Sequence, residues 1–293
     1  MATVNAPVLS ESTNKSLITR YPLITFFTLA IAFSWVAASP SLLLGVPFKP
    51  YQTLGAFSPL LAGFIVSATL NGRAGVIELL QRMTVWRFGL SSYMLAIFGL
   101  VILYLTTVLL SGALPIQALV EKWILIFSFY IPALFTTYLI NPIGEETGWT
   151  GFALHHLQKQ FSPWLSALIL GVVWAIWHLP AYFIPSEMGA FNLFGFVIFM
   201  FIAICTRVIW TWITNKAKGS GIAGVSLHAS SNAVSIGLIP LLLPATQPNQ
   251  ADDSSGPILL GLLFLSTVLI LIFTRGRLSY QKNEQEQPIG MGQ

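Results

Sequence analysis

Charged residues are scarce in this sequence. Asp, Glu, Lys and Arg make up only 8% of its 293 residues, whereas soluble domains carry about 25%. Cysteine is also nearly absent, because Cys205 is the one copy, and this excludes a disulfide framework and a thiolate metal cluster. Residues 1–20 are polar and lack the apolar segment of a signal peptide, so we expect none.

The sequence instead contains long apolar runs. Hydrophobic residues make up 55% of the chain, and the mean hydropathy is +0.76. Eight runs approach the roughly 20 residues that a membrane-spanning helix needs: 21–45, 52–70, 91–113, 122–139, 163–184, 190–214, 221–243 and 257–273. The sequence therefore predicts an all-α, polytopic protein with eight transmembrane helices, multi-pass in the cell membrane.

The positions of the basic residues predict how the chain is oriented. The net charge of +4 is compatible with nucleic-acid binding, but the charges lie at the ends of apolar runs, so we expect the lipid bilayer and no nucleic acid as a partner. Twelve Lys and Arg residues fall on the side of the N-terminus, against only Lys49 and Lys122 on the other side. Cytosolic loops carry the excess of Lys and Arg. Both termini are therefore expected to be cytosolic.

The order of polar and apolar segments suggests five regions. Residues 1–20 form a cytosolic tail, and 21–121 hold the first three transmembrane helices, with an amphipathic cytosolic segment at 71–89. Residues 122–243 form a membrane domain that carries all the polar motifs, and 244–274 hold the last transmembrane helix. Residues 275–293 form a polar C-terminal tail that we expect to be disordered.

Three polar motifs interrupt the apolar pattern within 122–243. The first is the adjacent pair Glu145 and Glu146, the second contains His178, and the third contains His228 and Asn232. Ionisable groups are expensive inside a bilayer, so each is by default a functional candidate. Alone, each motif also has an ordinary explanation, such as a helix terminus for the carboxylates or helix packing for His228 and Asn232.

Helix geometry predicts that the first two motifs meet. The sequence around Ser162 and Pro163 is typical of a turn that starts a helix. Glu145 lies 16 residues before Phe161 and His178 lies 17 residues after it. On antiparallel helices both would lie roughly 25 Å from the turn, at the same depth. His228 and Asn232 are four residues apart and share one helix face. His228 lies about 15 Å along its helix from the turn near Lys218.

The residue types allow two kinds of hydrolytic site. Glu145, His178 and His228 could bind Zn²⁺ with an open position for water. Alternatively, Glu145 and His178 could activate water without a metal, while His228 and Asn232 donate hydrogen bonds to the developing oxyanion. The sequence leaves both alternatives open.

The motifs resemble a known family. Glu-Glu followed by Trp-x-Gly-Phe, then an aromatic residue ahead of a Trp-His pair, then His-x-x-x-Asn, is similar to the CPBP intramembrane proteases. That family, also called Abi or type II CAAX endopeptidases, includes the CAAX prenyl protease 2 enzymes. The resemblance covers roughly residues 122–243. It implies that Glu145, Glu146, His178, His228 and Asn232 form the catalytic site, with either a metalloprotease or a metal-free glutamate mechanism.

Two positions depart from the family's pattern. Trp174 stands where the second motif has Phe, and we expect this bulky aromatic side chain to pack in a similar way to that Phe. Thr150 stands where the first motif has Arg, which removes a permanent positive charge. Without that charge we expect one carboxyl of the pair to be protonated near neutral pH. Arg207 is the candidate replacement, and we expect it to pair with Glu146.

The resemblance favours an intramembrane endopeptidase that hydrolyses a peptide bond near the inner leaflet. Its substrate would be a peptide or protein, with lipid modification left open. The alternative is a non-catalytic scaffold or bacteriocin-immunity protein that kept the fold after losing the motif arginine. A proton-coupled transporter ranks third, because no internal repeat is visible.

Overall fold

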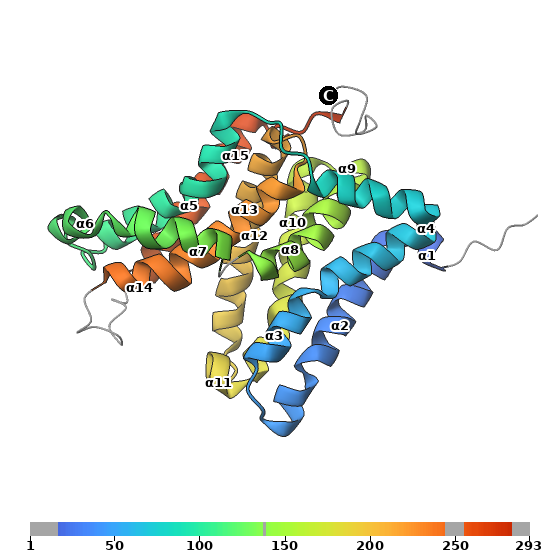
Figure 1. The fold of residues 1–293 in the computed structure, drawn as a ribbon, viewed down its shortest axis with the longest axis horizontal. Helices are drawn as coiled ribbons and strands as arrows, with labels where there is room; N and C mark the ends of the chain where they lie inside the picture. Colours follow the sequence, from blue (N-terminus) through green and yellow to red (C-terminus); the bar gives the residue numbers. More distant parts are fainter. Residues whose placement is uncertain (1–16, 137–138, 244–254, 283–293) are drawn as a thin grey trace, which may run out of the picture.

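The computed structural model describes residues 17–136, 139–243 and 255–282, and these residues form helices and connecting segments without a strand (Figure 1). Seven of the described helices are long and apolar enough to cross a membrane, and a bent helix pair raises the number to eight. The predicted all-α, multi-pass fold is thereby confirmed. The sidedness of the termini stays a prediction.

The N-terminal part is a helical hairpin with a break in its second arm. The short α1 (Leu17–Arg20) leads into α2 (Pro22–Leu44), which packs along α4 (Ser58–Met83). The helix α3 (Lys49–Ala56) joins them, so the predicted second span begins a turn earlier than expected. Helix α4 is kinked at Gly72, whose φ of 56° is left-handed and suits glycine.

The predicted amphipathic segment corresponds to the part of α4 beyond this kink. There Leu79 is buried, whereas Ile77 and Leu80 are about half exposed. Arg82 pairs with Glu78 and donates a hydrogen bond of 3.3 Å to the carbonyl oxygen of Gly151. This segment is thus attached to the motif-bearing helix.

The span expected at 122–139 belongs to a bent helix pair in the structure. After α5 (Leu90–Leu110) the chain forms α6 (Ile116–Lys122) and then η1 (Ile126–Tyr130) with α7 (Ile131–Thr136), and the two halves are bent by 54°. Lys122 lies at the bend, where its ammonium donates hydrogen bonds to the carbonyl oxygens of Leu241 and Leu242. These carbonyls end a helix, so a cation is favourable there. The expected span also includes residues 137 and 138, which lie outside the described residues.

The motif-bearing half begins with the expected hairpin. Its first arm runs through α8 (Ile140–Glu146), the π-helical η2 (Thr147–Leu154) and α9 (His155–Gln160). Its second arm is α10 (Pro163–His178), continued by the 3₁₀ turn η3 (Leu179–Phe183). Ser162 and Pro163 occupy the predicted cap and first helical positions, so the predicted turn is confirmed.

The remaining described elements complete the bundle. After α11 (Pro185–Met188), α12 (Leu193–Lys216) packs along α10 more extensively than any other pair of elements pack. Helix α13 (Gly221–Asn232) continues through η4 (Ala233–Leu238) and α14 (Ile239–Leu242), and α15 (Ser255–Thr274) covers α12 and α5. The helix α8 packs against both α4 and α13, which places the first motif in the centre of the molecule (Figure 1).

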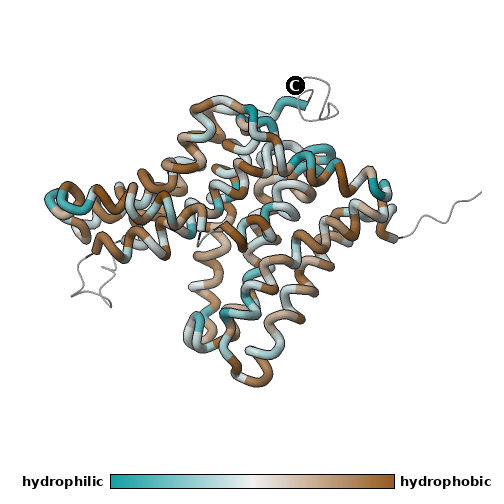
Figure 2. The backbone as a smooth tube through the Cα atoms, in the orientation of Figure 1, coloured by the Kyte–Doolittle hydropathy of each residue, from teal (hydrophilic) through white to brown (hydrophobic). Residues whose placement is uncertain are grey.

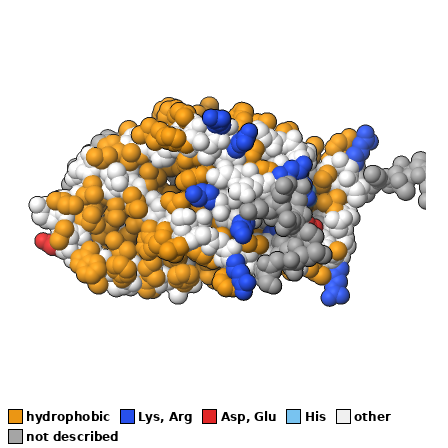
Figure 3. Space-filling view, turned by 90° about the horizontal axis from the view of Figure 1, so that it is seen from above, with side chains coloured by type: hydrophobic (Ala, Val, Ile, Leu, Met, Phe, Trp, Pro, Cys, Tyr) orange, Lys and Arg blue, Asp and Glu red, His pale blue; other side chains and the backbone are white. Residues whose placement is uncertain are grey.

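The exterior is apolar around the bundle and basic at one end. Figure 2 shows hydrophobic segments along most of the outer helices, and side chains such as Leu43 and Phe273 are each 81% exposed. Such surfaces are expected where lipid replaces water. Figure 3, the view from above, shows Lys and Arg side chains gathered on one face. This basic face agrees with the charge asymmetry read from the sequence.

The C-terminal segment is ordered where the structure describes it. Leu278 is fully buried, and the side chain of Asn215 donates a 3.0 Å hydrogen bond to its carbonyl oxygen. The prediction of disorder from residue 275 onward is therefore wrong for residues 275–282. This polar segment contains an apolar residue, Leu278, whose burial holds the segment in place. The rest of the predicted tail lies outside the described residues.

Glycine permits the close contact between η2 and α4. A Cβ atom on Gly148 would lie 2.3 Å from the carbonyl oxygen of Pro59, and one on Gly144 would lie 2.7 Å from that of Ala56. Both distances are too short for any side chain. The sequence therefore keeps glycine where the motif helix meets its neighbours.

We predict that Gly148→Ala destabilises the fold, because overpacking a rigid backbone contact costs about 1–3 kcal/mol. Gly261→Ala in α15 is the matched control, since its Cβ would meet no atom within 4 Å. Thermal unfolding in detergent should show a lower midpoint for Gly148→Ala and an unchanged or higher midpoint for Gly261→Ala. Equal midpoints for the two variants would show that this contact does not constrain the fold.

Candidate active site

The two carboxylates of the first motif are both buried. Glu145 and Glu146 end α8 and are 6% and 0% exposed. The helix continues into η2 without interruption, so the segment from Ile140 to the turn at Ser162 forms one arm, as the depth argument required. Adjacent residues on a helix point in directions about 100° apart, so the two side chains have different neighbours.

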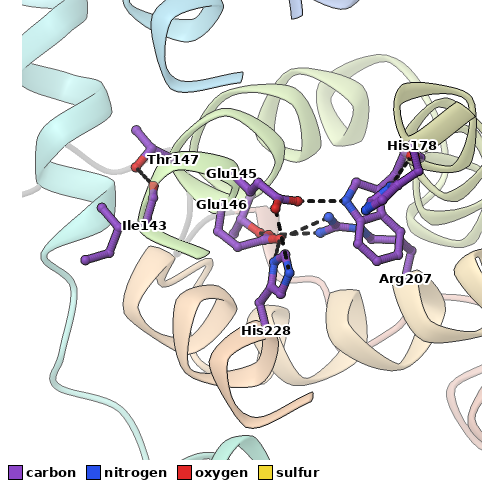
Figure 4. Close-up of polar contacts among 9 residues, drawn as sticks. Ile143, Glu145, Glu146, Thr147, His178, Arg207 and His228 are labelled. Carbon is purple, nitrogen blue, oxygen red and sulfur yellow. Dashed lines mark hydrogen bonds and ion pairs between the residues drawn. The ribbon is translucent and has the colours of Figure 1, made fainter. Parts of the chain in front are cut away.

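Glu146 forms a bidentate ion pair with Arg207 (Figure 4). The guanidinium nitrogens Nη1 and Nη2 lie 2.9 and 3.0 Å from Oε2 and Oε1 of the carboxylate. Arg207 is 1% exposed, and its guanidinium carbon lies 4.6 Å from the ring centre of Trp174 and 5.0 Å from that of Trp210. The predicted pairing of Arg207 with Glu146 is confirmed. A buried charge needs such a partner, because its desolvation costs several kcal/mol.

Thr150 also contacts Glu146. Its hydroxyl donates a 2.6 Å hydrogen bond to Oε2, from one helical turn further along. Thr150 therefore gives the carboxylate a hydrogen bond but no charge. The positive charge comes from Arg207 on α12. Arg207, 57 positions later in the sequence, thus supplies a positive charge that the resembled motif would have at position 150.

His228 connects the two carboxylates. Its Nδ1 lies 3.0 Å from Oε1 of Glu146, and its Nε2 lies 3.9 Å from Oε1 of Glu145. Because Arg207 holds Glu146 in its ionised form, which only accepts hydrogen bonds, Nδ1 carries the proton in this contact. This bond fixes the ring and turns Nε2 toward Glu145, as an orienting carboxylate does for a functional histidine.

Trp174 contacts the other carboxylate. Its indole Nε1–H donates a 3.1 Å hydrogen bond to Oε2 of Glu145. The carbonyl oxygen of Trp174 accepts a 2.9 Å hydrogen bond from Nδ1 of His178, so in the neutral ring Nε2 keeps its lone pair. The sequence analysis assigned Trp174 to packing alone and missed this contact. Its spacing four residues before His178 is the signal that places both on one helix face.

A cavity of about 400 Å³ lies beside this cluster. Its walls include four of the five predicted site residues: Glu145, His178, His228 and Asn232. Glu146 does not line it and lies behind Glu145 and His228. The cavity is also lined by Asn141, one turn before Glu145, which the sequence analysis did not assign.

The predicted zinc ligands do not form a recognisable metal site. Within the described ranges, no group of three His, Cys, Asp or Glu side chains is placed to hold one ion. One nitrogen of His228 is bound to Glu146 and one nitrogen of His178 to a backbone carbonyl, which leaves Nε2 of each neutral ring with its lone pair. Glu145, His178 and His228 are nevertheless not grouped around one position, so in this arrangement they do not fit a metal.

Comparison with known proteins agrees with the motifs. Residues 126–234 match the family model of type II CAAX prenyl endopeptidase Rce1-like proteins. The chain is also 27% identical to the CAAX prenyl protease 2 of Methanococcus maripaludis over 229 residues, which cover 74% of this chain and 80% of that protein. The resemblance noted from the sequence is confirmed.

We predict that Glu146 and Arg207 stabilise the fold jointly, so that losing one of them lowers the free energy of unfolding more than losing both. Arg207→Met should lower the free energy of unfolding by about 3–5 kcal/mol, because it leaves a buried carboxylate without its partner. Adding Glu146→Gln in the same chain should restore most of the loss. Unfolding in denaturant of the wild type, both single variants and the double variant measures the coupling. Additive losses in the double variant would contradict the pairing.

Proposed function

We propose that this multi-pass membrane peptidase, whose motif region is of the Rce1-like type, hydrolyses a peptide bond with a water molecule activated by Glu145. The observation that supports this most is that Glu145, His178, His228 and Asn232 line one cavity, whereas Glu146 is neutralised behind them. A general base must face the substrate. Glu145 is the carboxylate of the pair that does.

The catalytic steps follow from the contacts of these side chains. Water binds against Glu145 and gives it a proton as the oxygen attacks the scissile carbonyl carbon. The C–O bond forms, and the carbonyl oxygen becomes an oxyanion that accepts hydrogen bonds from the carboxamide of Asn232 and from Nε2–H of His228 in its doubly protonated form. Glu145 then returns the proton to the leaving nitrogen as the C–N bond breaks.

His178 and Glu146 have supporting roles in this proposal. Nε2 of His178 accepts a hydrogen bond from the attacking water, since Nδ1 is already bound to Trp174. Glu146 holds His228 through Nδ1 and is itself held by Arg207. We therefore assign Glu146 to positioning, although the motif alone placed it in the catalytic set.

The proposed mechanism uses no metal, which is one of the two alternatives that the sequence left open. It is supported by the placement of Glu145, His178 and His228, which are not grouped to hold one ion in the described part of the chain. Metal analysis of the purified protein tests it directly. Stoichiometric zinc that is lost on replacing His178 or His228 would overturn the metal-free assignment.

The substrate we propose is a peptide or protein segment that reaches the cavity within the bilayer. The related archaeal protein is named for prenylated substrates, and peptide pairs with and without a lipid group would establish whether this chain shares that preference. The cavity walls include residues of α3, which lies in the lower half of Figure 1.

We predict that Glu145→Gln abolishes cleavage of a peptide library in detergent while the protein stays folded. Loss of a general base lowers the rate by about 10²–10⁴-fold. Glu78→Gln is the matched control, because Glu78 is an exposed carboxylate that pairs with Arg82 far from the cavity. Cleavage products are identified by mass spectrometry. Retained cleavage in Glu145→Gln would rule out the assignment, and a wild type without activity on any peptide would favour the non-catalytic alternative.

A further inference from the structure

We infer that a second, apolar cavity between α5, α12, α13 and α15 binds one acyl chain of an anionic phospholipid, whose phosphate lies against Lys216. Among the described residues, this cavity shares no lining residue with the active-site cavity. The site is therefore separate from the proposed peptidase chemistry, and the inference does not depend on which reaction the protein performs.

The first observation is the cavity itself. It has a volume of about 280 Å³, and its described lining consists of apolar side chains with one glycine and one serine. Apolar cavities of about 150 Å³ stay free of water and bind molecules such as benzene. Water would find too few polar partners here, and an empty cavity would leave its walls without dispersion contacts. A hydrocarbon chain supplies those contacts without needing polar partners.

The cavity opens on the lipid-facing side of the bundle. Its inner wall includes Leu100, Ile213 and Leu227, which are all buried. Its rim includes Leu95, which is half-buried, and Leu269, which is 42% exposed. These two rim residues belong to α5 and α15, which pack against each other (Figure 1). The mouth of the cavity thus faces the bilayer, whose hydrocarbon consists of acyl chains.

The second observation is that the four helices around the cavity start or end at one level. The side chain of Asn215, near the end of α12, donates a 3.0 Å hydrogen bond to the carbonyl oxygen of Leu278, just beyond α15. The hydroxyl of Ser220, at the start of α13, donates one to the carbonyl oxygen of Val85, shortly before α5. The exposed basic residues at these helix ends are Arg87, Lys216, Lys218, Arg275 and Arg277. Figure 3 shows Lys and Arg side chains gathered on one face beside hydrophobic ones.

The cavity lies largely in the leaflet next to this basic end. Two of its lining residues are Ile213, three residues before Lys216, and Ile270, four residues before Thr274. A rise of 1.5 Å per residue places them about 5–6 Å below the helix ends. Ser266, eight residues before Thr274, lies about 12 Å below. The hydrocarbon of one leaflet is about 15 Å thick, so the cavity lies at the depth of acyl chains whose head groups are at the basic end.

Lys216 connects the cavity to the basic end. Its ammonium nitrogen lies 5.4 Å from the ring centre of Trp212, whose side chain lines the cavity. Lys216 is exposed and forms no salt bridge with a carboxylate among the described residues. A lysine in this position attracts the phosphate of an anionic lipid at the membrane surface. The phosphate on Lys216 and the chain beside Trp212 then belong to one lipid molecule.

The test of the head group measures lipid binding to the purified protein in detergent. Native mass spectrometry counts bound phosphatidylglycerol and phosphatidylcholine with the same acyl chains, and thermal unfolding at increasing lipid concentration gives the apparent affinity. The wild type should hold one phosphatidylglycerol molecule and prefer it to phosphatidylcholine. Lys216→Gln should weaken phosphatidylglycerol binding about fivefold, as expected for one lysine charge beside an anionic head group. Lys159→Gln is the control, because Lys159 is an exposed lysine that does not line the cavity.

Gly99→Leu tests the acyl chain. A Cβ on Gly99 would lie 4.0 Å from its nearest neighbour, Cδ2 of Leu95, so the backbone need not move and the new side chain would fill part of the cavity. Phosphatidylglycerol binding should become at least about tenfold weaker. Gly261→Leu is the matched control, because a Cβ on Gly261 would meet no atom within 4 Å and this residue does not line the cavity. Ser266→Leu narrows the same cavity from α15 and gives the same test if Gly99→Leu does not fold.

Three results would overturn the inference. The first is phosphatidylglycerol binding that is unchanged in Gly99→Leu and Ser266→Leu, which would remove the acyl chain from this cavity. The second is equal affinity of the wild type for the two lipids, or equal effects of Lys216→Gln and Lys159→Gln, which would remove the head group from Lys216. The third is displacement of the bound lipid by a lipid-modified peptide, which would assign the cavity to the substrate.

Discussion

The buried ion pair between Glu146 and Arg207 is the contact on which the arrangement of the site depends. It joins α8 to α12, and through His228 it also fixes α13. Two tryptophan rings cover the guanidinium from the sides that the carboxylate leaves open. Each of these groups would be costly in this environment alone, and together they compensate one another. The geometry of the candidate site is therefore a consequence of how one buried carboxylate is neutralised.

The two neighbouring glutamates acquire different functions from different surroundings. Glu146 receives hydrogen bonds from Arg207, Thr150 and His228, which leaves it no free position for a substrate. Glu145 receives one hydrogen bond from Trp174 and otherwise faces the cavity. A pair that looks symmetric in sequence is thus divided into a positioning group and a group that can act on water. The same division explains why the loss of the motif arginine at position 150 does not by itself argue for an inactive protein.

Much of this fold could be predicted from the sequence, because membrane spans leave strong apolar signals and α-helices have a fixed rise. The turn at Ser162 and the common depth of Glu145 and His178 follow from counting residues, and Arg207 was the remaining cation close enough in depth to Glu146. The contact that Lys122 makes at the bend could not be predicted, since its partners are carbonyl groups of a helix more than 100 residues later. The same holds for the anchoring of Leu278 by Asn215. Such contacts are set by tertiary packing and have no local pattern.

The separation of Glu146 and Arg207 along the chain also constrains how the protein is made. The two residues are 61 positions apart, so α8 is synthesised and reaches the membrane well before α12. During that interval Glu146 lacks its partner, and a lone carboxylate is costly in lipid. The nascent helix must therefore keep this carboxyl group in contact with water or bind a proton until α12 follows. The pairing with Arg207 can therefore form only once α12 has been inserted.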